Sequence, residues 1–412
     1  MMPAQAHRSL DVVLLFTGFI ASTYGFGLYL FPAMVETVRI DMPFSYAAMG
    51  SITGGVQAGF MLCALLAGFM TLRFGATALI LGSVAVCALA LAGLTIAPDI
   101  AIAAMLLTVL GGCAAAVWVP MVDVVHTLIP RRHQAKALGL MSSGTSYGVF
   151  LNSFLLTDLL GPLGWRPLWG ISGGLVAALL MIGIVRLRGR MPRSDHGAPA
   201  FGAAPSALSR LRALPAGLSA LVLCMMLLNG LACMPFQTYL SPFIEREAHG
   251  SAVEAAQAWR IIGLTGMVSG FAMGALADRI TVRRGLLLTY LVLAGACALL
   301  VAAAHGGQDA LLTGAALAFG LSFYPIFGLV PAYVSQTSKE GDAALLFALG
   351  NIALGMGGII GNMLGGYLKD LTESFVPIYL MMLGAALLSA VICLFLPKQR
   401  SSLVSQATEV AR

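Results

Sequence analysis

The stretch Gly274–Gly285, GALADRITVRRG, places one acidic and three basic side chains between two long apolar runs. The flanking runs, at about 255–277 and 284–304, each match the roughly 20 residues that a helix needs to cross a bilayer. A short charged segment between two such runs is typical of a loop that joins two membrane-spanning helices. The same alternation continues in both directions along the chain and decides the class of fold.

Composition agrees with a membrane environment. Hydrophobic residues make up 59% of the 412 residues and charged residues only 10%, whereas soluble domains carry about 25% charged residues. Because backbone polar groups find no partner in hydrocarbon, the apolar runs are predicted to be helices. We expect an all-α integral membrane protein of twelve transmembrane helices in two pseudo-symmetric six-helix bundles. The predicted spans are 12–34, 46–71, 76–97, 100–124, 135–158, 166–186, 215–243, 255–277, 284–304, 308–334, 343–367 and 374–396.

The usual sequence signs of catalysis and metal binding are missing. The seven cysteines lie in apolar runs without CxxC spacing, so we expect no disulfide, metal site or cofactor. The segment Gly144–Gly148, GTSYG, matches the GxSxG pattern of hydrolases but lies within a predicted span instead of a strand-to-helix turn. No HExxH or P-loop sequence is present. We therefore expect neither an enzyme, including a membrane-embedded one, nor an ATP-driven pump.

Lysine and arginine are distributed unevenly between the two ends of the spans. With a cytoplasmic N-terminus, 18 of the 23 basic residues lie on the cytoplasmic side. Because basic residues concentrate in cytoplasmic loops, both termini are predicted to be cytoplasmic, and the compact loops suggest a bacterial inner membrane. The net charge of +6 then needs no nucleic-acid partner. The five basic residues on the other side are Arg39, Arg166, Arg246, Arg260 and Lys369.

An internal repeat divides the chain into two halves. With a shift of 210 residues, Tyr29 coincides with Tyr239 and Asn152 with Asn362, and a shift of 211 fits better at the start of the fifth span. Duplicated halves are common in secondary transporters. We predict an N-terminal half at 1–186, a cytoplasmic linker at 187–214, a C-terminal half at 215–396 and a cytoplasmic tail at 397–412.

Two loops resemble those of the major facilitator superfamily. These are GALADRITVRRG at 274–285 and LIPRRHQAKALG at 128–139. The resemblance implies that the aspartate of the first motif helps to close the cytoplasmic face, so Asp278 and Arg279, with Arg283 and the first-half Arg73, are candidate gating residues. The first half departs from the pattern, because Leu72 occupies the position that matches Asp278. The alternative is that these charges only mark the cytoplasmic side.

The resemblance also implies a central cavity lined by spans one, four, seven and ten. Aromatic and amide side chains in these spans are therefore candidate substrate contacts, although each could instead form hydrogen bonds between helices. Arg260 lies about one turn inside span eight and either faces the cavity or extends to the interface. The candidates are Tyr24, Trp118, Asn229, Gln237 and Tyr324, together with Asn351 of span eleven and Arg260.

Asp123 and His126 are candidates for proton coupling. Three residues apart on a helix, they share one face, and a carboxylate beside an imidazole can transfer a proton. The alternative is a solvated structural pair with Arg131 or Arg132.

These features predict a secondary active transporter for a small organic metabolite. The segment Tyr24–Pro32, YGFGLYLFP, loosely resembles monocarboxylate and oxalate–formate carriers, which implies an organic acid and a cationic residue in span eight or eleven. The chain departs from this pattern, because the core of span eight has no basic residue and span eleven has none before Lys369, so Arg260 would have to take that role. Efflux of hydrophobic or drug-like compounds is the alternative. The expected partners are the small-molecule substrate and membrane lipid, and the chain is expected to be a monomer.

Overall fold

The computed structural model describes residues 3–129, 131–187, 215–305, 309–338 and 342–397. Nearly all of the predicted linker and tail lies outside these residues. The first bundle contains α1 (Pro3–Ile20), η1 (Ala21–Tyr29), α2 (Leu30–Asp41), α3 (Tyr46–Phe74), α4 (Ala76–Thr95), α5 (Ile100–Leu128), α6 (Arg131–Ser142), α7 (Gly144–Phe154), η2 (Leu155–Leu159), α8 (Leu160–Leu163) and α9 (Trp165–Leu187). The second contains α11 (Ala216–Arg246), α12 (Ala252–Ile280), α13 (Val282–Ala303), α14 (Asp309–Thr337), α15 (Asp342–Thr372) and α16 (Val376–Phe395).

Eleven helices of the described chain are long and apolar enough to cross a membrane. They correspond to every predicted span except the fifth. The all-α membrane fold is therefore confirmed, with helices that extend several residues beyond the predicted ends, as at Leu10–Asp41 and Ala216–Arg246.

The fifth segment runs through the bundle in pieces, so the prediction of one regular helix at 135–158 needs correction. It consists of α6, α7, η2 and α8, with a turn at Ser143 between α6 and α7. Hydroxyl groups along it bond to carbonyls of the preceding turn, as in Ser143 to Leu140 (2.6 Å) and Thr157 to Ser153 (2.7 Å). Such bonds compete with the backbone ladder and bend helices.

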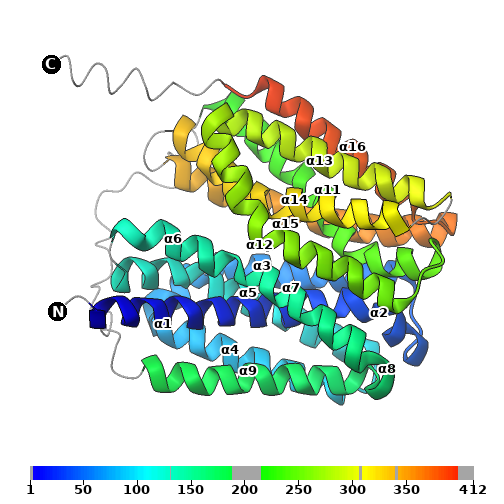
Figure 1. Ribbon diagram of the computed structural model, residues 1–412, viewed down its shortest axis with the longest axis horizontal. Coiled ribbons are helices and arrows are strands. Elements are labelled where there is room, and N and C mark those ends of the chain that lie inside the picture. The colour runs from blue at the N-terminus through cyan, green and yellow to red at the C-terminus, as the bar shows by residue number, and fades with distance from the viewer. Residues whose placement is uncertain (1–2, 130, 188–214, 306–308, 339–341, 398–412) are drawn as a thin grey trace.

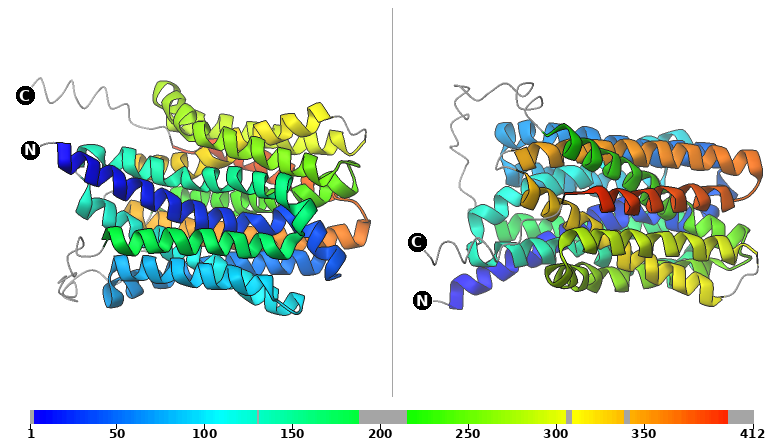
Figure 2. Two further views of the ribbon diagram at one scale, coloured as in Figure 1. Left: turned by 60° about the horizontal axis from the view of Figure 1, so that its bottom comes forward. Right: turned by 90° about the horizontal axis from the view of Figure 1, so that it is seen from above.

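The helices form two bundles that lie side by side with their axes roughly parallel (Figure 1). The first, blue to green, lies below the second, green to red, and other views show the same division (Figure 2). The start of α1 and the end of α16 lie at the same end of the molecule. We call this end the terminal face and the other end the opposite face.

Equivalent amides join the first and fifth spans of each bundle. Asn152 of α7 donates to the carbonyl of Gly25 in η1 (2.6 Å). In the second bundle, Asn362 of α15 accepts from the hydroxyl of Thr238 in α11 (3.0 Å). These two asparagines coincide in the 210-residue shift, so the repeated sequence builds the same helix crossing twice.

The first span contains a nine-residue π-helix, η1, between two α-helical parts. Long π segments are rare, and π geometry within α-helices occurs frequently at functional sites. Two tyrosines of the first span, Tyr24 and Tyr29, lie in η1. The π-helical part of the first span therefore carries both Tyr24, a predicted substrate contact, and Tyr29.

Candidate functional site

The two bundles pack against each other through the second span, α3, and through the parts of the first and fifth spans nearest the opposite face. The pairs in extensive contact are α2 with α11 and α12, α3 with α15, and α7 and η2 with α12. By contrast, α1 and α6, the parts of the same spans at the terminal face, have their extensive contacts only within the first bundle. The structure is therefore a state closed towards the opposite face, with the bundles less tightly joined at the terminal face.

Contact at the closed end is backbone against backbone. Gly50 of α3 approaches Asn362 of α15 so closely that an added Cβ would lie 2.2 Å from the asparagine carbonyl oxygen. Only glycine permits such an approach, as is common where membrane helices cross. The backbones of α3 and α15 therefore touch at this point, with no room for a side chain between them.

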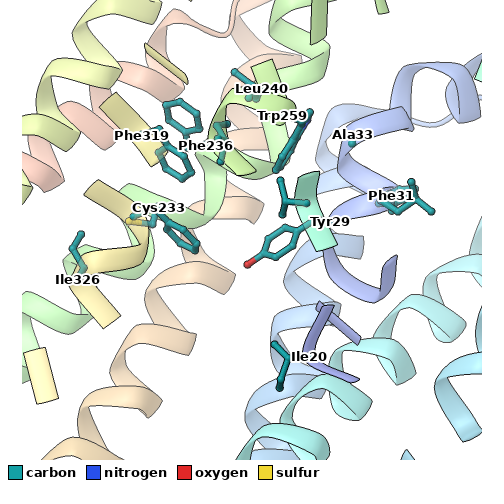
Figure 3. Packing of buried hydrophobic residues seen from close by; sticks show 14 of the residues in the cluster. Ile20, Tyr29, Phe31, Ala33, Cys233, Phe236, Leu240, Trp259, Phe319 and Ile326 are labelled. Carbon is teal, nitrogen blue, oxygen red and sulfur yellow. The ribbon is translucent and has the colours of Figure 1, made fainter. Parts of the chain in front are cut away.

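Tyr29 lies at the centre of the contact between the bundles. Its ring lies against that of Trp259 in α12, with centroids 6.2 Å apart, and its phenol lies near the side chain of Gln237 in α11. Figure 3 shows Tyr29 beside Trp259, with its hydroxyl directed towards the ribbons of the second bundle. Gln237 is only 6% exposed and lies about 14 Å from the end of α11, given 1.5 Å per residue. A buried amide thus lies deep in the span, near the boundary between the two bundles.

A second aromatic group lies within the first bundle. Tyr24 makes edge-to-face contacts with Phe60 of α3 and with Trp118 of α5, at centroid distances of 6.0 and 6.4 Å. Two residues predicted as substrate contacts, Tyr24 and Trp118, therefore lie together. Their faces offer the stacking surface that a ring-shaped ligand needs.

The predicted amides differ in their surroundings. Asn229 of α11 is fully buried, and its Oδ1 accepts from the Cys233 thiol at 3.3 Å, but its Nδ2 has no partner among the described residues. A buried unpaired donor requires an explanation, such as a ligand or water. Asn351 of α15 is exposed and donates to the carbonyl of Phe347 in its own helix (3.1 Å). Asn229 thus retains unused hydrogen-bonding capacity, whereas Asn351 bonds locally.

Tyr324 belongs to a pocket at the terminal side of the second bundle. The pocket has a volume of about 240 Å³ between α12 and α14, and it extends from Tyr324 past Gly270 and Gly274 to Asp278. The Tyr324 ring also lies against Gly266, next to the hydroxyl of Ser146 in the first bundle. One predicted substrate contact and one predicted gating residue therefore share a pocket, which the sequence did not indicate.

Arg260 lies between the bundles and has no acidic partner. Its guanidinium donates to the hydroxyls of Ser153 and Thr157, both at 3.1 Å, and lies 4.5 Å from the centroid of the Phe154 ring. No ion pair among the described residues includes Arg260. Neutral hydroxyls and an aromatic face leave its positive charge uncompensated.

The predicted gating residues are not joined to one another in this state. Asp278 and Arg279 are exposed near the end of α12, and no ion pair of the described chain includes them. Arg283 donates to the carbonyl of Leu396 (3.0 Å), at the end of α16. Arg73 lies over the ring of Phe74, its neighbour (5.6 Å).

The proposed proton-coupling pair lies in α5, but the side chains of Asp123 and His126 are outside the part of the chain described in atomic detail. Elsewhere in the described chain, no cluster of three or more His, Cys, Asp or Glu side chains could hold a metal ion.

Comparison with known proteins gives a consistent group of relatives. The family model of the Major Facilitator Superfamily matches residues 14–361. Two curated relatives, each named "Probable sugar efflux transporter", come from Helicobacter pylori strains J99 and P12. They are 27% and 26% identical over 159 residues, which is 39% of this chain and 38% of each relative. The match thus spans well under half the length of these relatives.

Solved structures share the fold at low identity. The nucleoside transporter NupG aligns with a TM-score of 0.75 and 14% identity, over 94% of this chain and all of NupG. The inward-open xylose transporter XylE from E. coli gives 0.74 and 13%, over 95% and 97% of the two chains. A bacterial homologue of the human lysosomal transporter Spinster, in an inward-facing, unoccupied conformation, gives 0.68 and 15%, over 96% of each chain.

Proposed function

Because the chain belongs to the Major Facilitator Superfamily, we propose that it is a secondary active transporter that moves a small, uncharged, hydroxyl-rich organic solute by alternating access. The two bundles rock about a central site, which opens to one membrane face at a time. In this view, the state described above is open towards the terminal face.

The observation that carries the substrate class is the contact of Tyr29 with Gln237 and Trp259 across the bundles. An amide, a phenol and aromatic faces suit a neutral ring that carries hydroxyls, because each hydroxyl both donates and accepts. The unpaired Nδ2 of Asn229 supplies a further donor on the same helix as Gln237. The names of the Helicobacter pylori relatives support a sugar-like solute and the direction of efflux.

An organic acid is the second candidate, and Arg260 favours it. The Arg260 guanidinium contacts only two hydroxyls and a ring among the described residues. It can therefore donate two hydrogen bonds to a carboxylate in bidentate geometry. Efflux of a hydrophobic compound would use the aromatic faces of Tyr24 and Trp118 without the amides.

We place the terminal face in the cytoplasm, because 18 of the 23 basic residues belong to that side when the N-terminus is inside. We also propose a bacterial inner membrane, a monomer, and coupling to protons through Asp123 and His126.

The test is thermal unfolding of the purified protein against a panel of solutes. The panel contains hexoses and pentoses, nucleosides, small carboxylates and lipophilic cations, each at acidic and neutral pH. A ligand at 100 times its dissociation constant stabilises the folded state by about 2.7 kcal/mol. Stabilisation by a sugar or nucleoside that is lost in Gln237→Leu supports the proposal. Stabilisation only by a carboxylate, lost in Arg260→Met, would transfer the assignment to the organic acid.

A further inference from the structure

A buried carboxylate joins the two bundles at the opposite face. Glu36 of α2 is 1% exposed. One of its oxygens accepts from Arg39 (2.9 Å) and from the phenol of Tyr46 (3.0 Å), and the other accepts from Arg246 of α11 (2.6 Å). Arg39 and Tyr46 belong to the same bundle as Glu36, whereas Arg246 comes from the other. The Glu36–Arg246 bond therefore exists only while α2 and α11 lie together.

A second carboxylate joins the bundles in the reverse direction. Asp370 of α15, in the second bundle, accepts from the backbone N–H groups of Tyr46 (3.1 Å) and Ala47 (2.8 Å). These are the first two residues of α3, in the first bundle. The first N–H groups of a helix have no partner within it, and negative charge is favourable there. Asp370 thus caps a helix of the other bundle.

Tyr46 takes part in both links. Its phenol donates to Glu36, its backbone N–H donates to Asp370, and the guanidinium of Arg39 lies 3.7 Å from the centroid of its ring. A movement of α3 away from α15 that breaks the Asp370 bonds therefore also disturbs the surroundings of Glu36. The two links are expected to form and break together.

We propose that the Glu36–Arg246 pair and the Asp370 cap of α3 form a latch that holds the opposite face closed, and that both must break before that face can open. The inference rests on the proposed alternating access and identifies the contacts that set its equilibrium. Arg39 and Tyr46 occupy one oxygen of Glu36, and Arg246 is the only described donor to the other. Separation of the bundles leaves that second oxygen unpaired until water enters, so the latch stabilises the state in which the bundles meet. Nothing in the basic-residue count or in the loop motifs points to this function.

The test uses hydrogen–deuterium exchange with mass spectrometry on the full-length protein in lipid nanodiscs, without a solute. Glu36→Gln combined with Asp370→Asn removes both charges at nearly constant volume. We expect the ratio of molecules open at the opposite face to molecules closed there to rise about tenfold, within the roughly 5- to 150-fold range typical of a coupling between two sites. Exchange should increase at 42–54 and 240–248, and decrease at the terminal-face ends of α12 and α14.

The chain offers a matched control in Glu247. This acid also lies at the opposite face, where it accepts from Ser374 Oγ (2.6 Å) and the Phe375 N–H (2.5 Å) and pairs with Lys369 (3.8 Å), all within the second bundle. Lys369 and Phe375 touch the ring of Tyr46, but Glu247 itself bonds to no group of the first bundle, so Glu247→Gln should change exchange mainly at 369–378, without the reciprocal change at the terminal face. If the double variant fails to fold, Arg246→Gln breaks the first link and leaves Glu36 paired with Arg39.

The reciprocal change at the terminal face separates a latch from local fraying. An increase confined to 42–54, with no decrease at the terminal face, would overturn the latch. So would an equal response in Glu247→Gln. If instead the wild type binds a solute but no variant or solute ever produces opposed changes at the two faces, alternating access itself fails, and with it the proposed function.

Discussion

The crossing of η1 and α7 gives the sharpest prediction, because its two backbones touch. A Cβ added at Gly148 would lie 2.3 Å from the carbonyl oxygen of Ala21 and 2.7 Å from Cα of Gly25. Ordinary van der Waals contact begins near 3.4 Å, so Gly148→Ala must displace α7 from η1 by about 1 Å. No side chain can rotate to relieve the contact. Overpacking of this kind costs about 1–3 kcal/mol, from which the helix preference of alanine over glycine recovers up to about 1 kcal/mol.

Thermal unfolding of Gly148→Ala and Gly174→Ala, side by side, measures this cost. Gly174 lies within α9, and a Cβ there would meet nothing within 4 Å. We expect Gly148→Ala to unfold at a lower temperature than the wild type, and Gly174→Ala at the same or a higher temperature. Because η1 carries Tyr24 and Tyr29, the displacement should also weaken solute binding. Equal unfolding temperatures for both variants would show that the crossing is not in close contact, and the reasoning would fail.

Three further predictions concern the site, the terminal face and the repeat. Tyr29→Phe removes a phenol that lies near Gln237 and Trp259. A solute that hydrogen-bonds to this phenol should lose about 1–3 kcal/mol of binding free energy, which is roughly a 5- to 150-fold loss of affinity; unchanged affinity by calorimetry would contradict a role for Tyr29 in the site. Asp278→Asn should slow transport in proteoliposomes. Because Asp278 is exposed, the free energy of unfolding should stay within about 0.5 kcal/mol of the wild type, and a larger loss would indicate a structural role instead. Asn152→Ala and Asn362→Ala should each cost about 0.6 kcal/mol, and at most about 1.7, since each removes one bond between spans; a much larger cost for one alone would show that the two crossings are not equivalent.

The spans were predictable because a bilayer imposes one length and one polarity on each helix. The division of the fifth span was not, since its apolar content passes the same criterion although a turn at Ser143 and the π segment η2 divide the helix. The sequence likewise contains no pattern that predicts the π geometry of η1. Hydropathy records burial in lipid, whereas these irregularities depend on bonds between particular turns.

The site was only partly predictable, and Tyr29 shows why. In the repeat it is equivalent to Tyr239, and nothing in the sequence separates the two. In the structure, Tyr239 donates to the carbonyl of Asn362 within its own bundle, whereas Tyr29 meets Gln237 and Trp259 of the other. Tyr24 and Trp118 were each predicted to face the cavity from their spans, and the structure brings them together. The asparagines at 152 and 362 make equivalent contacts within their bundles, whereas Tyr29 and Tyr239 differ because only Tyr29 meets the other bundle.

The two faces of the molecule also differ in their acidic residues. At the terminal face, the last turn of α3 carries Leu72, 62% exposed, where the last turn of α12 carries Asp278. Only one of the two acids that the family resemblance implies is therefore present there. At the opposite face, acids from both bundles bond across the boundary: the buried Glu36 pairs with Arg246, and the exposed Asp370 accepts from the first N–H groups of α3. Buried, charge-assisted bonds contribute more than exposed ones. The distribution of acids thus favours closure of the opposite face, and a bound solute has to supply the difference in free energy before the terminal face can close in its place.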